Sequence, residues 1–208
     1  MYRMDYSTLA SREIVDKTIE NLKKNNIEGE FIATKEQALA RIKELIPPGA
    51  SVMNGASQTL EAIGYIEYLK SGSHGWINPK DAILAEKDPA KQAIMRRQSV
   101  LSDYYLGSAH AVAQTGELVF GSNTGSQLPP IVYTSPNLIF VVSTMKITPT
   151  LEDARRRLYD YVVPLEDARL MAAFNAHTHL SKELIFHYEN PVGGRKIRVL
   201  FVGEKLGF

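Results

Sequence analysis

The chain has 208 residues, of which 44% are hydrophobic and 23% charged, ordinary values that suit one α/β domain and exclude a disordered chain. Its formal net charge is +1, so we expect neither nucleic acid nor a membrane surface as a partner. The sequence has no Cys, which excludes disulfides, a thiolate nucleophile, Cys-ligated zinc and a Cys-bound iron–sulfur cluster.

The longest apolar runs are much shorter than the roughly 20 residues of a membrane-spanning helix. Residues 1–12 lack the apolar stretch of a secretory signal. We therefore expect a cytoplasmic protein without a transmembrane segment.

Helices and strands are predicted to alternate through the first half of the chain. Apolar spacing, capping residues and Pro or Gly breaks place helices at residues 11–25, 34–45, 57–70 and 88–101. Short apolar runs predict strands at residues 30–33 and 50–53, and residues 71–88 are expected to be a loop with a short strand near Ile77. Residues 104–120 are predicted to form a strand, a helical turn and a second strand.

In the second half, the continuous apolar run at residues 138–142 is typical of a central parallel strand. Two helices are expected at residues 152–161 and 165–174, interrupted at Pro164. Two β-type runs, at 183–188 and 196–202, flank a turn and predict a hairpin.

These elements predict an α/β fold of three layers, with a largely parallel sheet flanked by helices and a C-terminal β-hairpin at one edge. We expect a single domain over residues 1–208, with an N-terminal helical segment at 1–28 and the hairpin within 180–208.

Two loops that follow predicted strands are candidate binding sites for a small anion, because ligands in open α/β sheets bind beyond the carboxyl ends of the strands. The first is also explained as a capped turn before a helix, and the second as a solvated loop. Their candidate residues are Asn54, Gly55, Ser57, Gln58 and Thr59 in the first loop and Asn123, Thr124, Gly125, Ser126 and Gln127 in the second. Neither has the glycine and lysine pattern of a P-loop or a Rossmann turn.

Further candidates lie near the predicted strand ends. Lys146 closely follows the apolar strand, where its ammonium is expected to meet an anionic substrate, although a surface lysine also fits. His110 is a candidate acid or base, with a packed histidine as the alternative, and it lies between Ser108 and Gln114.

Two other groups suggest function less strongly. The spacing of His177, His179 and His187 does not match a metal site, so we expect a surface loop. The triplet Arg155-Arg156-Arg157 lies on a helix with Glu152 and Asp153 and predicts a solvated face. We expect no metal and no cofactor.

The order of several segments over nearly the whole chain resembles the LUD domain, the lactate-utilisation family that includes lactate-utilisation protein C. The Gly55 to Gly64 stretch matches one family segment, Thr115-Gly116-Glu117-Leu118 matches another, and Lys146 matches a lysine after a strand. The second match adds Thr115 and Gly116 to the candidate binding residues. Many family members of similar length carry a cysteine cluster before the C-terminal strands, and this chain has Ala176-His177-Thr178-His179 there.

The resemblance implies a fold similar to the superfamily of glucosamine-6-phosphate deaminase, ribose-5-phosphate isomerase and CoA transferases. It also implies a role in oxidising lactate to pyruvate with iron–sulfur partner proteins. A first hypothesis is therefore a non-redox subunit or accessory factor that binds a small anion or a partner protein, with a homo-oligomer as a further possibility.

A second hypothesis is a stand-alone enzyme acting on a phosphosugar or an acyl-CoA. Asp103, Glu117 or His110 would then be the acid–base group, and Lys146 would hold the anion. This alternative depends on fold analogy, and a fold alone does not define a function. A partner-binding module without a small ligand is a third possibility.

Overall fold

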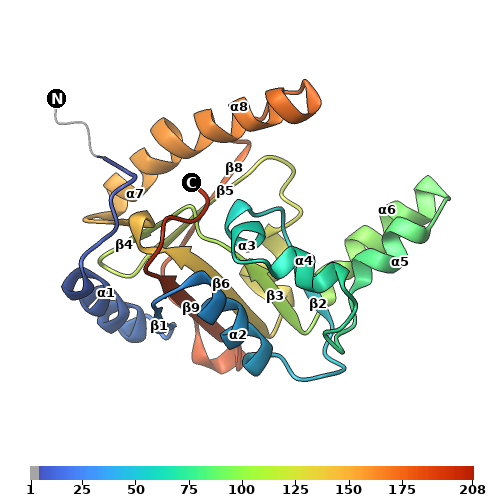
Figure 1. Ribbon diagram of the computed structural model, residues 1–208, viewed down its shortest axis with the longest axis horizontal. Helices are drawn as coiled ribbons and strands as arrows, with labels where there is room; N and C mark the ends of the chain where they lie inside the picture. The colour runs from blue at the N-terminus through green and yellow to red at the C-terminus, as the bar shows by residue number, and fades with distance from the viewer. Residues whose placement is uncertain (1–4) are drawn as a thin grey trace.

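The computed structural model describes residues 5–208, which fold into two sheets covered by helices (Figure 1). The α-helices are α1 (Arg12–Lys24), α2 (Lys35–Leu45), α3 (Gln58–Ala62), α4 (Tyr65–Lys70), α5 (Pro79–Ala85), α6 (Pro89–Gln98), α7 (Leu151–Arg157) and α8 (Val163–Phe174). The strands are β1 (Glu28–Ile32), β2 (Val52–Asn54), β3 (Tyr104–Gly107), β4 (Ala111–Ala113), β5 (Leu118–Ser122), β6 (Asn137–Ser143), β7 (Ile147–Thr148), β8 (Lys182–Phe186) and β9 (Lys196–Val202). Shorter 3-10 and π-helical turns are η1 (Ser99–Leu101), η2 (Pro130–Thr134), η3 (Thr144–Lys146), η4 (Leu158–Val162) and η5 (Pro191–Gly193).

A five-stranded sheet in the order β1-β9-β6-β3-β2 has every neighbouring pair parallel. The predicted α/β class with a largely parallel sheet flanked by helices is therefore confirmed. A smaller mixed sheet has the order β7-β4-β5-β8.

The five-stranded sheet has a hydrophobic core on each face. On one face, Val141, Leu200 and Val202 pack against α2, α3 and α4. On the other face, Phe140 and Phe201 pack against α1 and the smaller sheet. The helices α2 to α4, the large sheet, and α1 with the small sheet thus form successive layers, and α7 covers the outer side of the small sheet.

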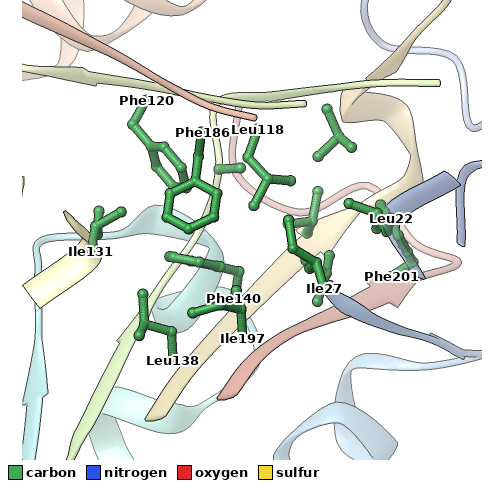
Figure 2. Close-up of a cluster of buried hydrophobic side chains, with 14 of the residues drawn as sticks. Leu22, Ile27, Leu118, Phe120, Ile131, Leu138, Phe140, Phe186, Ile197 and Phe201 are labelled. Atoms are coloured by element: carbon green, nitrogen blue, oxygen red, sulfur yellow. The ribbon is translucent and has the colours of Figure 1, made fainter. Parts of the chain in front are cut away.

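Aromatic side chains join the two sheets. Figure 2 shows Phe120 and Phe186 of the small sheet pointing toward Phe140 of the large one. The ring centroids of Phe120 and Phe140 are 5.0 Å apart, within the range of favourable aromatic pairs. The small sheet is therefore part of the same core as the large one.

The predicted C-terminal hairpin is wrong, although both of its strands are present. β8 pairs antiparallel with β5 in the small sheet, whereas β9 lies between β1 and β6 in the large sheet. The reason is the composition of β9: Val199 and Phe201 enter one core while Leu200 and Val202 enter the other. A strand that is apolar on both faces is buried at the centre of a sheet rather than at its edge.

Three local predictions also differ from the structure. α5 forms inside the expected loop, because Asn78 caps it and Pro79 is its first residue. No helical turn forms between β3 and β4 within the described part of the chain. Pro164 does not interrupt the helix that runs from α7 to α8, since the π-helical turn η4 precedes it.

The expected segment at residues 1–28 begins outside the described residues, and its described part contains α1 with Ser11 as its N-cap. Among residues 5–208, no helix has the length and apolar character needed to cross a membrane.

Candidate functional site

A cavity of about 460 Å³ opens at the carboxyl ends of strands in the large sheet. The loop after β2 forms one wall, the residues after β3 and β6 form the floor, and the loop after β5 forms a second wall. α8 and the segment that follows it complete the enclosure. The volume lies within the range of small-molecule sites.

The topology explains why these segments meet. β6, β3 and β2 are adjacent and parallel, so their carboxyl ends emerge side by side at one edge of the sheet. Gly55 allows the loop after β2 to lie close to β3 and to the loop after β5. A Cβ at this position would lie 2.9 Å from Gln127 Oε1 and 3.0 Å from the Tyr105 hydroxyl.

Lys146 lies at the floor of this cavity and is only 2% exposed. Its Nζ donates hydrogen bonds to Thr59 Oγ1 at 2.9 Å and to Ser108 Oγ at 3.1 Å. No carboxylate of the described residues forms an ion pair with it. A buried lysine is therefore held by two neutral hydroxyl groups.

Both hydroxyl groups are oriented to accept from Lys146. The Thr59 hydroxyl donates to the carbonyl of Leu206 at 3.4 Å, and the Ser108 hydroxyl donates to the carbonyl of Ala109 at 3.2 Å. Their own protons are directed at backbone carbonyls, so their lone pairs face the Lys146 nitrogen.

Burial lowers the pKa of Lys146 to about 7, and the nearby charge of Arg157 adds to the effect. Arg157 is completely buried; burial lowers its own pKa to about 10. Near neutral pH, Arg157 therefore stays charged while Lys146 is divided between ammonium and amine.

Arg157 contacts the floor of the cavity from behind. Its Nη1 donates to the carbonyl of His110, and its Cζ lies 5.1 Å from the ring centroid of Tyr161. Its Nε and Nη2 have no hydrogen-bond partner among residues 5–208. The buried positive charge at this point is therefore not neutralised by a carboxylate of the described chain.

His110 lines the same cavity. Burial, together with the charges of Lys146 and Arg157, lowers its pKa to about 3, so the imidazole is neutral at pH 7. Its Nδ1 accepts a hydrogen bond from the Gly121 N–H at 3.1 Å. The proton of the neutral ring is consequently assigned to Nε2, which makes His110 a hydrogen-bond donor.

The structure brings eleven of the sixteen sequence-predicted binding residues to the cavity wall. These are Gly55, Ser57, Gln58, Thr59, Ser108, His110, Asn123, Thr124, Ser126, Gln127 and Lys146.

Five candidates do not line the cavity. Asn54 and Gly125 neighbour lining residues. Gln114, Thr115 and Gly116 are distant, because the turn between β4 and β5 lies against α1: Asn21 Nδ2 donates to the Gln114 carbonyl at 2.7 Å.

Two acid–base candidates of the enzyme hypothesis are also outside the cavity. Asp103 precedes β3 and accepts from the backbone N–H and hydroxyl of Ser51, so it lies at the opposite end of the sheet. Glu117 accepts from the Thr115 hydroxyl in the turn before β5.

Sequence reasoning missed the wall formed by α8 and the residues after it, where Arg169 pairs with Glu166 at 2.7 Å. It also assigned Arg157 to a solvated face, which is wrong. Arg155 pairs with Glu183 and Arg156 with Glu152, but Arg157 is buried. The signal in the sequence was Ala154 and Tyr161, which lie three residues before and four residues after Arg157 and belong to or pack against the same buried cluster.

The histidine-rich segment lies at the surface, with His177 and His179 both exposed. His177 contacts Asp167 at 3.0 Å and His179 lies at the cavity rim. No group of three or more His, Cys, Asp or Glu with a metal-binding arrangement occurs in the part of the chain that the structure describes.

Fold and cavity together define an α/β protein with a candidate ligand site beyond the strand ends of a parallel sheet. The family model for the LUD domain matches residues 15–182. The chain therefore belongs to the LUD domain family, and the predicted resemblance is confirmed. This family is implicated in lactate utilisation.

The structure is similar to the crystal structure at 1.70 Å resolution of a DUF162 family protein from Deinococcus radiodurans. The TM-score is 0.54 at 13% sequence identity, over 94% of this chain and 100% of the other. At this identity the likeness supports the fold. No curated protein matches the sequence.

Proposed function

We propose that this chain binds a small carboxylate anion in the cavity, as a non-redox subunit or accessory factor in the oxidation of lactate to pyruvate. Iron–sulfur proteins would be its partners in that reaction. The observation that carries the proposal is the buried Lys146, which faces the cavity without a carboxylate partner among the described residues.

The electrostatics of the cavity floor favour an anion. Arg157 supplies a second buried positive charge behind Lys146, and a buried charge is costly unless a counter-charge or hydrogen bonds compensate it. A bound carboxylate would compensate the charge of Lys146, which lines the cavity, and would accept the third N–H of its ammonium.

The walls suit the polar part of such a ligand. Ser122 at the end of β5 and Thr124 and Ser126 in the loop after it contribute short hydroxyl groups. Gln127 is oriented by its hydrogen bond to the Gly121 carbonyl at 2.9 Å. These groups donate hydrogen bonds without bringing negative charge to the cavity.

The alternative, an enzyme acting on a phosphosugar or an acyl-CoA, is supported by the volume of about 460 Å³, which exceeds the needs of a three-carbon acid. The same hydroxyl-rich loop would suit a phosphate. The two functions share the cationic floor and differ in the size of the ligand.

The test is thermal unfolding of the protein with L-lactate, pyruvate, a phosphosugar and CoA. A ligand present at 100 times its Kd adds about 2.7 kcal/mol to the free energy of unfolding, or on the order of 5 °C for a chain of this size. We expect lactate or pyruvate to raise the melting temperature and Lys146→Met to abolish the increase.

Because anion binding favours the ammonium form, affinity for lactate should fall as the pH rises above about 7.

Lys70→Arg is the matched control. Lys70 is an exposed lysine that pairs with Glu67 at 2.8 Å, so its substitution should leave binding unchanged. A shift produced by the phosphosugar or CoA alone would favour the enzyme alternative. The absence of any shift over the whole panel would overturn the binding proposal.

A further inference from the structure

The Lys146 nitrogen has one tetrahedral position that no described residue occupies. Cε takes the first position, and the hydrogen bonds to Thr59 and Ser108 take two more. In the neutral amine both N–H groups are then used, and the remaining position holds the lone pair. Since Lys146 lines the cavity, its neutral form presents a nucleophile at a ligand site.

We propose that the Lys146 amine forms a Schiff base with the keto group of a 2-oxo acid, of which pyruvate is the smallest common example. This inference rests on the proposed function, because it takes the same cavity and one of the same acids. It adds a covalent step that simple anion binding does not include.

The step balances without an oxidant or a reductant. The lone pair of Nζ attacks the keto carbon, a C–N bond forms, and the carbonyl π electrons move to oxygen, which takes a proton as nitrogen loses one. The hydroxyl of this carbinolamine then leaves as water with a second proton. The products are a protonated imine and one water, and one proton is taken up overall.

The surroundings of Lys146 supply what this chemistry needs. His110 lines the cavity with its Nε2 assigned as a donor, and it is suited to donate a hydrogen bond to the departing hydroxyl. Burial beside Arg157 lowers the pKa of Lys146 to about 7, which keeps amine available at neutral pH, as nucleophilic lysines require. The product iminium keeps a positive charge next to the carboxylate of the acid.

The other charged groups that line the cavity lie at its rim. On α8, Arg169 is held by Glu166. On α3, the Glu61 carboxylate accepts from Gln58 Nε2 at 3.1 Å. His179 is exposed at the rim. None of these side chains forms an ion pair or hydrogen bond with Lys146 in the described part of the chain.

Lactate and pyruvate differ only at the carbon that the amine would attack. Lactate carries a hydroxyl group there and cannot form an imine, whereas pyruvate carries a keto group. The site is therefore inferred to hold lactate by charge and hydrogen bonds alone, and pyruvate by a reversible covalent bond in addition.

The experiment is reductive trapping of the full-length chain with pyruvate and cyanoborohydride, followed by peptide mass mapping. The expected product is a Lys146 peptide heavier by the mass of pyruvic acid plus two hydrogens less one water. Its yield should exceed that at Lys70 by at least about tenfold, since Lys70 is exposed and its pKa is raised by Glu67. Lactate should give no adduct and should compete with pyruvate.

The mapping uses the wild-type chain, so the result does not depend on whether a Lys146 variant folds. Lys146→Arg keeps a cation and removes the nucleophile, and it should lose the adduct. If pyruvate raises the melting temperature but Lys146 is trapped no more than Lys70, the Schiff base is wrong and the binding function stands. If neither acid shifts the melting temperature and no adduct forms, both proposals fail.

Discussion

Burial of Lys146 beside Arg157 places two cations in one low-dielectric region. Lys146 is the weaker base of the two, so it loses its proton at a lower pH. Arg157 has a pKa lowered to about 10 and remains charged, whereas that of Lys146 is lowered to about 7. His110, neutral for the same reason, completes a site with one permanent charge, one titrating amine and one neutral donor. Perturbed groups gathered in a cavity are typical of functional sites.

This arrangement predicts a stability cost at Lys146. In the unfolded chain lysine has a pKa of 10.5, against about 7 when folded, so between these values the unfolded state binds more protons and stability rises with pH. The slope is about 1.4 kcal/mol per pH unit, and the penalty is fully present below pH 7. Lys146→Met should therefore be more stable than the wild type at pH 7 by on the order of a few kcal/mol.

Urea unfolding of both proteins at several values between pH 6 and 10 measures this difference. The gain of the variant should shrink steadily above pH 7, because the wild type loses its buried charge there. His110, whose pKa is lowered to about 3, makes the stability depend on pH in a separate window, below pH 6.5. A difference that does not change with pH would show that Lys146 is not buried as an ammonium.

At the scale of elements, sequence reasoning succeeded where short-range patterns decide. Thr34 caps α2 and Asp88 caps α6, as their spacing predicts. It failed where pairing over long distances decides, as in β9, which is inserted between β1 and β6. The same distinction holds for the candidate site. The sequence predicted the loops that follow the strands, but it did not predict the wall contributed by α8, because that wall depends on tertiary packing.

The segment after β9 is the element that closes the cavity around Lys146. Its Leu206 carbonyl accepts from Thr59, and Gly207 has φ +62°. A Cβ at Gly207 would lie 2.6 Å from Thr59 Oγ1 and 3.4 Å from Lys146 Nζ. Gly207→Ala should therefore displace the Thr59 hydroxyl and reduce both lactate binding and pyruvate trapping.

Gly194→Ala is the matched control for this prediction. Gly194 has φ +65° and no atom within 4 Å of the added methyl group, so it shares the backbone strain of about 1 kcal/mol without the clash. In urea unfolding, Gly194→Ala should lose only the stability that this strain costs, and Gly207→Ala should lose more because of the clash. Equal effects on binding would contradict the role of the Gly207 contact.

For the molecule as a whole, the position of β9 links the two ends of the chain. β1 pairs with β9 and with no other strand in the described residues, so the N-terminal part of the sheet is complete only after the last strand has formed. The small sheet shares the core of Phe120, Phe140 and Phe186 with the large one. Contacts of such long range explain why the arrangement of the layers does not follow from local sequence patterns.

A shared core predicts that residues 5–208 unfold as one cooperative domain. Trp76, the single tryptophan of the sequence, is buried on the α4 side of the large sheet and donates to the Ile46 carbonyl at 3.1 Å. Its fluorescence reports on that layer, whereas far-ultraviolet circular dichroism reports on all helices and strands. The two signals should give the same urea midpoint.

Phe140→Leu should lower both midpoints equally, because Phe140 packs against both sheets. A dichroism transition in two steps, with fluorescence following only one of them, would instead assign the sheets to separate folding units.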